Sequence, residues 1–198
     1  MVYFIADMHL GHANILKHCN RPFSSVEEMD ETLIENWNSR VTDSDDVWII
    51  GDFAFRTAVS AEVYLKNLKG HKHLVKGNHD HTWMKGFDVR RYFESVNEIA
   101  ELRLDGKHIV MCHYPMMCWN KSHYGSYLIF GHIHNDTDLP FWDMIKGNDH
   151  MLNAGVDVNG FYPVTFDELV ENNRRFRTEK EAGCVSSCKE SLRMPASL

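Results

Sequence analysis

Side chains that bind metal ions recur at one kind of place in this sequence, directly after a short apolar run. Five such runs are typical of buried strands, and each is followed within a few residues by carboxylate, amide or imidazole groups. Because ligands bind at the carboxyl ends of strands in open α/β sheets, we expect these groups to gather at one edge. The runs and the residues that follow them are Val2–Ala6 with Asp7 and His9, Val47–Ile50 with Asp52, His73–Val75 with Asn78 and His79, Ile109–Cys112 with His113, and Tyr127–Phe130 with His132 and His134.

The donor types in this set favour catalytic metal ions. Imidazole with carboxylate suits zinc, manganese, iron, cobalt or nickel, and the lack of cysteine in the set argues against a closed structural zinc site. The donors are too many for one ion, whereas two ions about 3.5–4 Å apart need a bridging ligand, which an aspartate can supply. Two divalent ions, two aspartates and one hydroxide leave a net positive charge. That charge favours an anion such as a phosphate, with the hydroxide as nucleophile.

The elements that must position these residues change in character along the chain. Strand and helix patterns alternate at first, with helices expected after the capping box at 25–28 and over 61–68. From about Val96 an alternating run at 100–104 and the turn Asp105-Gly106 predict an antiparallel hairpin. The sequence therefore predicts a parallel core followed by an antiparallel meander. Glycines at 51, 77 and 131 are expected to let the backbone turn sharply before the ligands.

Length and composition predict one folded domain. The chain has 198 residues, of which 43% are apolar and 25% are charged, which is typical of a globular protein. A last helix is expected from the cap Thr165, and the chain becomes polar and serine-rich after about Arg177. We therefore expect a catalytic domain over 1–177 and a tail over 178–198 that is an appendage or partly disordered.

Charge and cysteine content narrow the classes of partner and compartment. Five cysteines are an odd number and do not suggest a disulfide framework. The sequence shows no apolar run long enough to cross a bilayer and no basic leader, so we expect a cytoplasmic protein with no membrane partner. The formal net charge is −7, which disfavours long duplex nucleic acid as a partner.

The order of these motifs resembles a known family. The sequence D-x-H, G-D, G-N-H-D, H, G-H-x-H, from Asp7 to His134, is similar to the signature of the calcineurin-like metallophosphoesterase superfamily. The resemblance extends over about 1–176. The openings at 6–15 and the segment at 153–158 look like its small, single-domain bacterial and phage-type branch. It implies a four-layer α/β/β/α sandwich, with two mixed sheets flanked by helices.

The resemblance also implies roles for the residues that match it. His79 is implied to be a catalytic residue that touches the leaving group or a phosphate oxygen without binding metal, a role that suits a group with a pKa near neutrality. Asp52 is implied to bridge the two ions. One ion is implied to be held by Asp7, His9, Asp52 and His134, and the other by Asp52, Asn78, His113 and His132.

One position departs from the family pattern. Phe55 stands where many members carry a second acid after G-D, so His79 must be oriented in another way. Arg56 matches an arginine of protein phosphatases and is a candidate to clamp phosphate, with a surface arginine as the alternative. His12 and Arg21 are further candidates for substrate binding, with structural or solvated positions as the alternatives.

These observations predict an enzyme, a metal-dependent phosphoesterase whose metal-held hydroxide attacks phosphorus. The expected cofactors are two divalent ions, with manganese, iron, zinc, nickel and cobalt all compatible. The partner is a small phosphate ester, and a nucleotide-type phosphodiester is favoured over a phosphomonoester or a phosphoprotein. A catalytically inactive scaffold for protein binding is the alternative from another class, and the intact ligand set speaks against it. The sequence does not indicate the oligomeric state.

Overall fold

Two four-stranded sheets form the centre of the molecule. A computed structural model describes the backbone of residues 1–191 and the side chains of residues 1–178. The first sheet has the strand order β1-β2-β3-β4, with every neighbouring pair parallel. The second has the order β5-β6-β7-β8. The strands are β1 Val2–Ile5, β2 Asp46–Ile50, β3 His71–Val75, β4 Ser95–Asn97, β5 Ile99–Leu104, β6 Lys107–Cys112, β7 Tyr127–Phe130 and β8 Met151–Asn153.

The five predicted strands are all present, but the second half of the chain is not an antiparallel meander. Only β5 and β6 pair antiparallel, across a turn in which Asp105 and Gly106 both have positive φ, and β6, β7 and β8 run parallel. Long crossings over 113–126 and 131–150 make this parallel pairing feasible, because parallel neighbours need long connections. Of the two sheets expected to be mixed, only the second is mixed.

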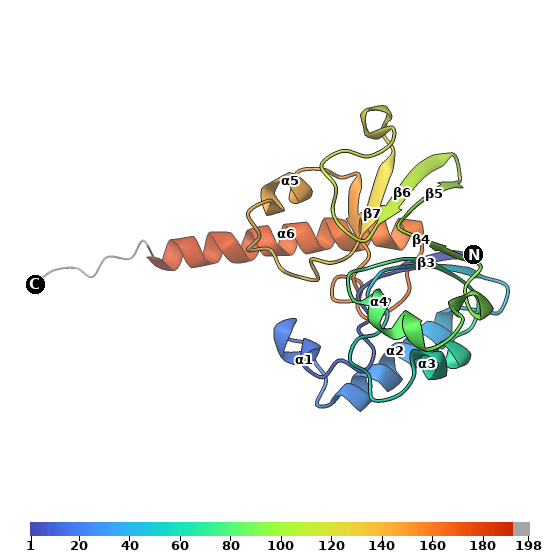
Figure 1. The fold of residues 1–198 in the computed structure, drawn as a ribbon. Coiled ribbons are helices and arrows are strands. Elements are labelled where there is room, and N and C mark those ends of the chain that lie inside the picture. The colour runs from blue at the N-terminus through green and yellow to red at the C-terminus, as the bar shows by residue number, and fades with distance from the viewer. Residues whose placement is uncertain (192–198) are drawn as a thin grey trace, which may run out of the picture.

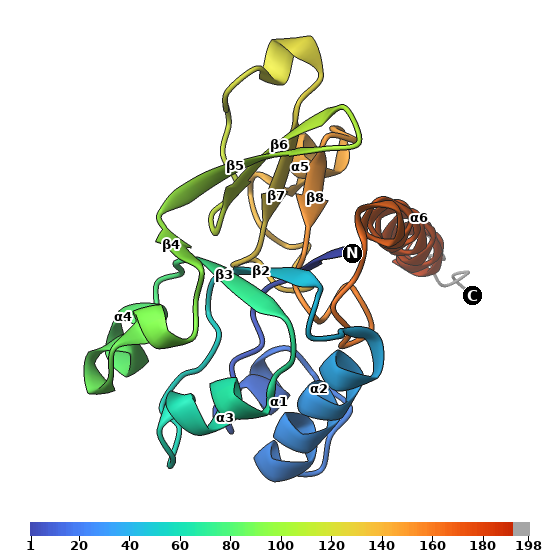
Figure 2. The ribbon, with the colours of Figure 1, turned by 90° about the vertical axis from the view of Figure 1, so that its right-hand side faces the viewer.

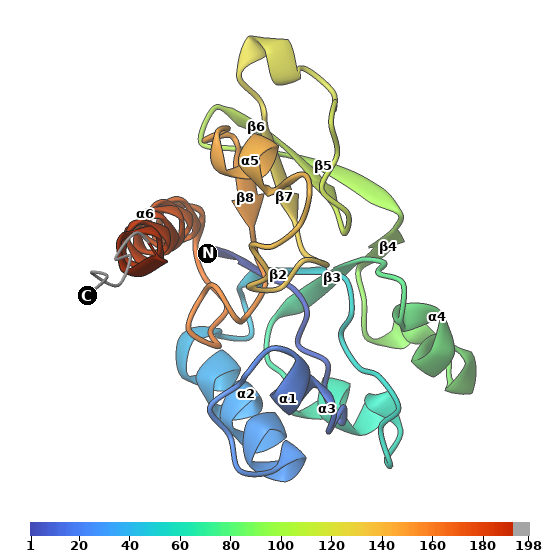
Figure 3. The ribbon, with the colours of Figure 1, turned by 90° about the vertical axis from the view of Figure 1, so that its left-hand side faces the viewer.

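Helices cover the outer face of each sheet, as the four-layer prediction requires. In Figures 2 and 3 the second sheet lies above the first, while α1, α2 and α3 lie below the first. The predicted caps are present, since Ser25 Oγ accepts the N–H of Glu28 at 3.2 Å and Thr165 Oγ1 accepts that of Glu168 at 3.4 Å. The helices are α1 Ile15–His18, α2 Val26–Arg40, α3 Ala61–Asn67, α4 Asp80–Trp83, α5 Trp142–Lys146 and α6 Phe166–Ser191.

Period-two patterning of the strands divides the apolar side chains among three cores. In β2, Val47 and Ile49 face α2 and α3, whereas Trp48 and Ile50 face the second sheet. The second sheet divides in the same way between the inter-sheet core and a core beneath α5. Such alternation follows from the pleat, which points successive side chains to opposite faces. Each sheet thus packs on a core on both faces, except that β5 exposes Ile99, Glu101 and Arg103 on one side.

The carboxyl ends of the two sheets are tied together. Ala6, directly after β1, donates its N–H to the carbonyl of Ala154 at 2.8 Å and accepts the N–H of Val156 at 3.0 Å. Ala154 in turn donates to the carbonyl of Phe130, at the end of β7, at 2.8 Å. These bonds bring the ends of strands from both sheets to one seam, where the metal-binding candidates follow.

Helix α6 closes one side of the sandwich and then continues past the expected domain boundary. Phe166 and Leu169 are buried in the core between the sheets, and the backbone remains helical to Ser191, extending away from the sheets (Figure 1). The boundary at 177 stays a prediction. The side chains of Cys184 and Cys188 and residues 192–198 lie outside the described part. Within the described residues, the helices include none that combines the length and apolarity of a bilayer span.

Candidate metal centre

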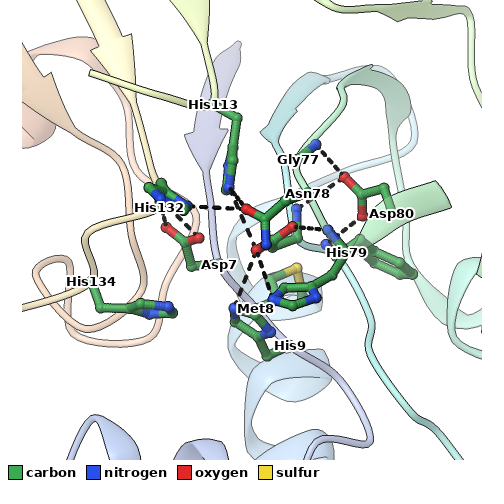
Figure 4. Close-up of polar contacts among 12 residues, drawn as sticks. Asp7, Met8, His9, Gly77, Asn78, His79, Asp80, His113, His132 and His134 are labelled. Carbon is green, nitrogen blue, oxygen red and sulfur yellow. Dashed lines mark hydrogen bonds and ion pairs between the residues drawn. The ribbon is translucent and has the colours of Figure 1, made fainter. Parts of the chain in front are cut away.

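The seven predicted ligands gather at the seam between the two sheets, and Figure 4 labels all of them except Asp52. Five of them have positive φ, a conformation that is uncommon outside glycine and clusters at functional sites. The turn after each strand therefore lies at the ligand itself, which aims its side chain back over the sheet edge. The five φ angles are 55° at Asp7, 53° at His9, 54° at Asp52, 71° at His132 and 50° at His134.

The two aspartates are buried at the centre of the cluster. Asp52 Oδ1 accepts the backbone N–H of His79 at 2.9 Å. Its other oxygen, Oδ2, lies 3.6 Å from His9 Nε2 and 3.5 Å from His113 Nε2. The Asp7 carboxylate accepts the N–H of His132, at 2.9 Å to Oδ2. Each carboxylate is thus fixed by a backbone donor from another loop and still presents oxygen to the cluster.

An amide and two imidazoles converge on one point beside Asp52. Asn78 Oδ1 lies 3.1 Å from His113 Nε2 and 3.0 Å from His132 Nδ1. His113 Nδ1 lies 3.0 Å from the carbonyl oxygen of Ile50, which can only accept, so Nδ1 carries the proton. The lone pair of Nε2 therefore faces the cluster. In metal sites, a hydrogen bond from the other ring nitrogen fixes a histidine ligand in the same way.

The other group of donors contains a histidine with no hydrogen-bond partner. Both ring nitrogens of His9 are buried and unpartnered, a costly arrangement unless an ion or water binds them. Ligand atoms of Asp7, His9 and His134 lie within 4.8 Å of one another, as do those of Asp7, Asp52 and His113. These are the distances that a pair of cation sites requires, and Asp7 is common to both groups.

Charge at the centre also fits cations. Burial raises the pKa of Asp7 to about 6. Burial alone would lower the pKa of His113, but its hydrogen bond to Asp52 and the charges of Asp7 and Asp52 raise that pKa to about 9. Both shifts arise from carboxylates held in a dry place with little positive charge around them. Divalent ions would supply that charge, so the residues present fit the implied metals.

Arg21 and Asp157 form a buried ion pair that holds His134, and the sequence did not predict this pairing. Asp157 Oδ2 lies 3.0 Å from His134 Nδ1, which leaves Nε2 free to face the cluster. Arg21 binds Asp157 through Nε at 2.8 Å and through Nη2 at 3.0 Å. It also donates to the backbone carbonyls of Asp7 at 2.7 Å and Met8 at 2.9 Å.

The structure therefore places Arg21 in neither of the two positions considered for it, a substrate ligand or a solvated loop residue. Its side chain is 0% exposed and its donors serve Asp157 and the loop after β1. The local sequence gives no sign of this, because Asp157 lies 136 residues further along the chain. The available signal in the sequence was the segment at 153–158, which contains Asp157 and resembles the single-domain branch of the superfamily. Cys19 and His134 also lie near Asp157, but that carboxylate is already neutralised by Arg21.

Asp80 joins two of the ligand loops. Its Oδ2 accepts the N–H of Asp52 at 3.0 Å and that of Gly77 at 2.7 Å, and its Oδ1 accepts the N–H of Phe53 at 3.0 Å. Trp83 Nε1 donates to Oδ1 at 2.8 Å. The carboxylate is thus used to fix the loops after β2 and β3 relative to each other.

An aromatic ring takes the place of the missing acid next to His79. The ring of Phe55 lies against that of His79, with centroids 4.0 Å apart, and against His12, with centroids 4.9 Å apart. His79 also meets His9 edge-on at 5.4 Å. The orientation of His79 is therefore fixed by ring packing and by Asp52, which accepts the backbone N–H of His79 and lies 3.9 Å from its Nε2.

The glycines before the ligands serve mainly to leave space. Gly51 has a φ of +81°, as expected for a sharp turn, but Gly77 and Gly131 do not have positive φ. A Cβ atom at Gly77 would lie 2.4 Å from Asp52 Oδ1, and one at Gly131 would lie 2.6 Å from Asp7 Oδ2. These two glycines let the strand ends approach the carboxylates, so our expectation of a turn was wrong for both.

Replacing Gly77 by alanine is expected to displace the Asp52 carboxylate, because the methyl group would overlap its Oδ1 atom. Metal binding should then weaken at least tenfold. Overpacking of this kind costs about 1–3 kcal/mol of stability. Gly86→Ala is the matched control, since nothing lies within 4 Å of its Cβ position. Metal titration by calorimetry, with thermal unfolding alongside, checks both variants. Equal metal affinity in Gly77→Ala and the wild type would contradict the proposed crowding.

Comparison with known proteins gives relatives along the whole domain. No protein-family model matches the chain. The uncharacterized protein MJ1445 of Methanocaldococcus jannaschii is 35% identical over 182 residues, spanning 89% of this chain and 95% of its own length. The chain thus combines the motif order with the expected fold, and MJ1445 aligns with it over nearly its whole length. The chain belongs to the same family as MJ1445.

A phage protein and a solved structure are also similar to this chain. The Gene 66 protein of Mycobacterium phage L5 is 29% identical over 164 residues, spanning 69% of this chain and 79% of its own length. A solved structure of a protein of unknown function from Aquifex aeolicus, AQ665, has a TM-score of 0.68 at 24% identity and covers 86% of this chain and 98% of its own. That likeness shows a shared fold.

The cluster of metal-binding candidates opens into a pocket of about 610 Å³, bounded on one side by α1. His12 lines it, with a buried Nδ1 that has no partner. Burial lowers the pKa of His12 to about 4, so this imidazole is neutral at pH 7. Arg56 is exposed and lies over the Phe55 ring at 5.1 Å, outside the lining of the pocket.

Proposed function

We propose that this protein hydrolyses phosphate esters with two divalent metal ions, and that its preferred substrates are small, nucleotide-type phosphodiesters. The observation that carries this proposal is the convergence of seven donor side chains, two of them carboxylates, from five loops beside an open pocket. An arrangement of this kind clamps the attacking and leaving oxygens of an in-line displacement. The motif order, through its resemblance to the superfamily, implies the same two-metal hydrolysis of phosphate esters.

The ligand sets proposed here follow the geometry. Asp7, His9 and His134 would hold one ion, and Asn78, His113 and His132 the other, with Asp52 between them. Bound ions would activate water and neutralise charge on the phosphate oxygens. His113 and His134 point the lone pairs of their Nε2 atoms toward these positions. Their Nδ1 atoms are occupied by the carbonyl of Ile50 and by Asp157, respectively.

His79 is the proposed proton donor to the leaving oxygen. Its side chain is 32% exposed and lines the pocket, whereas the ligands Asp52 and His113 are buried. Its Nε2 lies 3.9 Å from Asp52 Oδ2, close to the centre. A histidine with this access can give a proton to the departing alcohol near neutral pH.

The charge of the pocket favours diesters over monoesters. Its lining contains one lysine, Lys17, and no arginine, whereas a doubly charged monoester is best held by bidentate arginines. Neutral imidazoles and Asn14 suit a singly charged diester. This composition also gives no support to a phosphoprotein substrate, since Arg56 stands outside the lining.

A substrate screen on the metal-loaded protein tests the proposal. The apoprotein is reconstituted separately with manganese, iron, zinc, nickel or cobalt, and is assayed with bis(p-nitrophenyl) phosphate and p-nitrophenyl phosphate. We expect hydrolysis of both, with a higher kcat/KM for the diester, and loss of turnover in His79→Ala. If metal binds and neither ester is cleaved under any metal, the inactive scaffold is the better account.

Replacing Phe55 by alanine is expected to lower kcat about tenfold with little change in metal content, because the ring that packs on His79 at 4.0 Å is lost. A misplacement of a catalytic group by about 1 Å can cost up to about a hundredfold. Phe55→Tyr should restore most of the rate. Phe87→Ala, which removes a half-buried ring that packs on Trp83 and Tyr92, is the matched control. If the two alanine variants lose rate equally, Phe55 has no special role toward His79.

A further inference from the structure

A second hollow of about 430 Å³ lies beside the pocket, next to the loop that follows β7. The two hollows share His18, His132 and His134 in their linings. Two of these are proposed metal ligands, so both hollows adjoin the metal centre. A ligand over the centre can therefore extend into both.

The second hollow has a different chemistry from the first. Its lining includes the buried Ile133 and the half-buried Leu139 and Phe141, with the polar Asn135 and Asp136. Asn135 Nδ2 donates to the carbonyl of Cys19 at 3.2 Å, which ties this loop to the end of α1. An apolar wall with a few polar groups, already formed, is the usual make-up of a small-molecule site.

The position of His79 gives the two hollows different roles. His79 and His12 line the first hollow and are not part of the lining of the second. The alcohol that departs takes its proton from His79, so it leaves through the first hollow. In an in-line displacement the attacking oxygen lies opposite the leaving oxygen, so the substituent that stays on phosphorus lies to the side and can extend past His132 and His134 into the second hollow.

We propose that the second hollow binds the retained substituent of a phosphodiester, and that Phe141 stacks on a flat group there, such as the base of a nucleoside. This inference rests on the proposed function. In the reaction, a water oxygen bonds to phosphorus and the bond to the leaving oxygen breaks with its electron pair. The leaving oxygen takes the proton of His79, and the proton lost by water passes to solvent, from which His79 is reprotonated.

Two esters with the same leaving group test this assignment. Thymidine 5′-(p-nitrophenyl phosphate) and methyl p-nitrophenyl phosphate both release p-nitrophenolate, and differ only in the retained group. On the metal-loaded wild type we expect a higher kcat/KM for the thymidine ester. Stacking of a base on an aromatic side chain predicts a loss of about 5- to 150-fold for that ester in Phe141→Ala, mainly as a higher KM. The methyl ester should be cleaved at an unchanged rate.

Product binding gives a readout that does not depend on turnover. Calorimetry on the same metal-loaded proteins compares thymidine 5′-monophosphate with inorganic phosphate. Phe141→Ala should weaken the nucleotide and leave phosphate unaffected, and Phe141→Tyr should restore nucleotide binding. Met144→Ala is the control, because Met144 lies on α5, which Phe141 caps, and shares with Phe141 the lining of a neighbouring apolar hollow without lining this one.

The possible results separate the two proposals. An equal loss for both esters in Phe141→Ala, or nucleotide binding that does not change, overturns the role of the second hollow while the hydrolase stands. If the wild type cleaves neither ester, the proposed function fails, and this inference fails with it. A thermal unfolding curve for each variant shows whether the loss of the Phe141 ring has altered the fold.

Discussion

Replacing His79 by alanine is expected to lower kcat by about a hundredfold to ten-thousandfold while both metal ions remain bound, because a positioned proton donor contributes that much to a transfer reaction. The side chain of His79 lies within the open pocket, and its contacts with the centre are a backbone N–H to Asp52 and ring packing on Phe55 and His9. The backbone bond survives the substitution. The ligand loops should therefore keep their positions.

The measurement is steady-state hydrolysis of a diester with metal content determined on the same sample. A leaving group of low pKa, such as p-nitrophenolate, needs less protonation than an alkyl alcohol, so the defect should grow as the leaving group becomes more basic. His71→Ala is the control, because His71 is an exposed imidazole at the opposite end of β3. A loss of metal equal to the loss of rate would assign His79 to the ligand set instead.

The gathering of the candidate ligands could be predicted from the sequence because each follows its strand closely. A strand, a turn and a ligand are local in sequence, and parallel pairing of β1, β2 and β3 brings their carboxyl ends together without further information. The same holds for the capped starts of α2 and α6, since a capping box spans four residues. These features needed no knowledge of long-range contacts.

The support of the ligands could not be predicted, because it comes from distant parts of the chain. Arg21 and Asp157 meet across 136 residues, and Asp80 reaches the N–H of Asp52 across 28. Taken alone, an arginine in a loop and an aspartate after a histidine are typical of solvated residues. Their roles depend on which loops the two sheets bring side by side, and the parallel crossings of the second sheet were themselves not predicted.

The glycines show how a correct residue can be assigned the wrong physical reason. A glycine before a ligand suggests a turn, since only glycine adopts positive φ freely. Here the ligands Asp7, Asp52 and His132 take the positive φ themselves, while Gly77 and Gly131 leave space for carboxylates. Hydrogen bonds to carboxylates fix this backbone conformation, since Asp52 donates its N–H to Asp80 and His132 donates its N–H to Asp7. The sequence does not show where that conformation is located.

The bridging position is the other feature on which the proposed centre depends, and two aspartates compete for it. Asp52 Oδ2 lies within 3.6 Å of one imidazole from each proposed ligand set. Asp7, however, is the residue common to both groups of closely spaced donors. A bridge differs from a terminal ligand in that its loss weakens both ions together.

Asp52→Asn is expected to weaken both ions, by about a hundredfold or more each, because it removes a unit of negative charge about 4 Å or less from two cations. Asp7→Asn should weaken one ion strongly and the other little. Metal titration by calorimetry, with the bound stoichiometry measured after gel filtration, distinguishes them. Asp46→Asn, at the opposite end of β2 and half-exposed, is the control. If Asp7→Asn removes both ions and Asp52→Asn removes one, the bridge is Asp7, and the motif-based assignment of Asp52 is wrong.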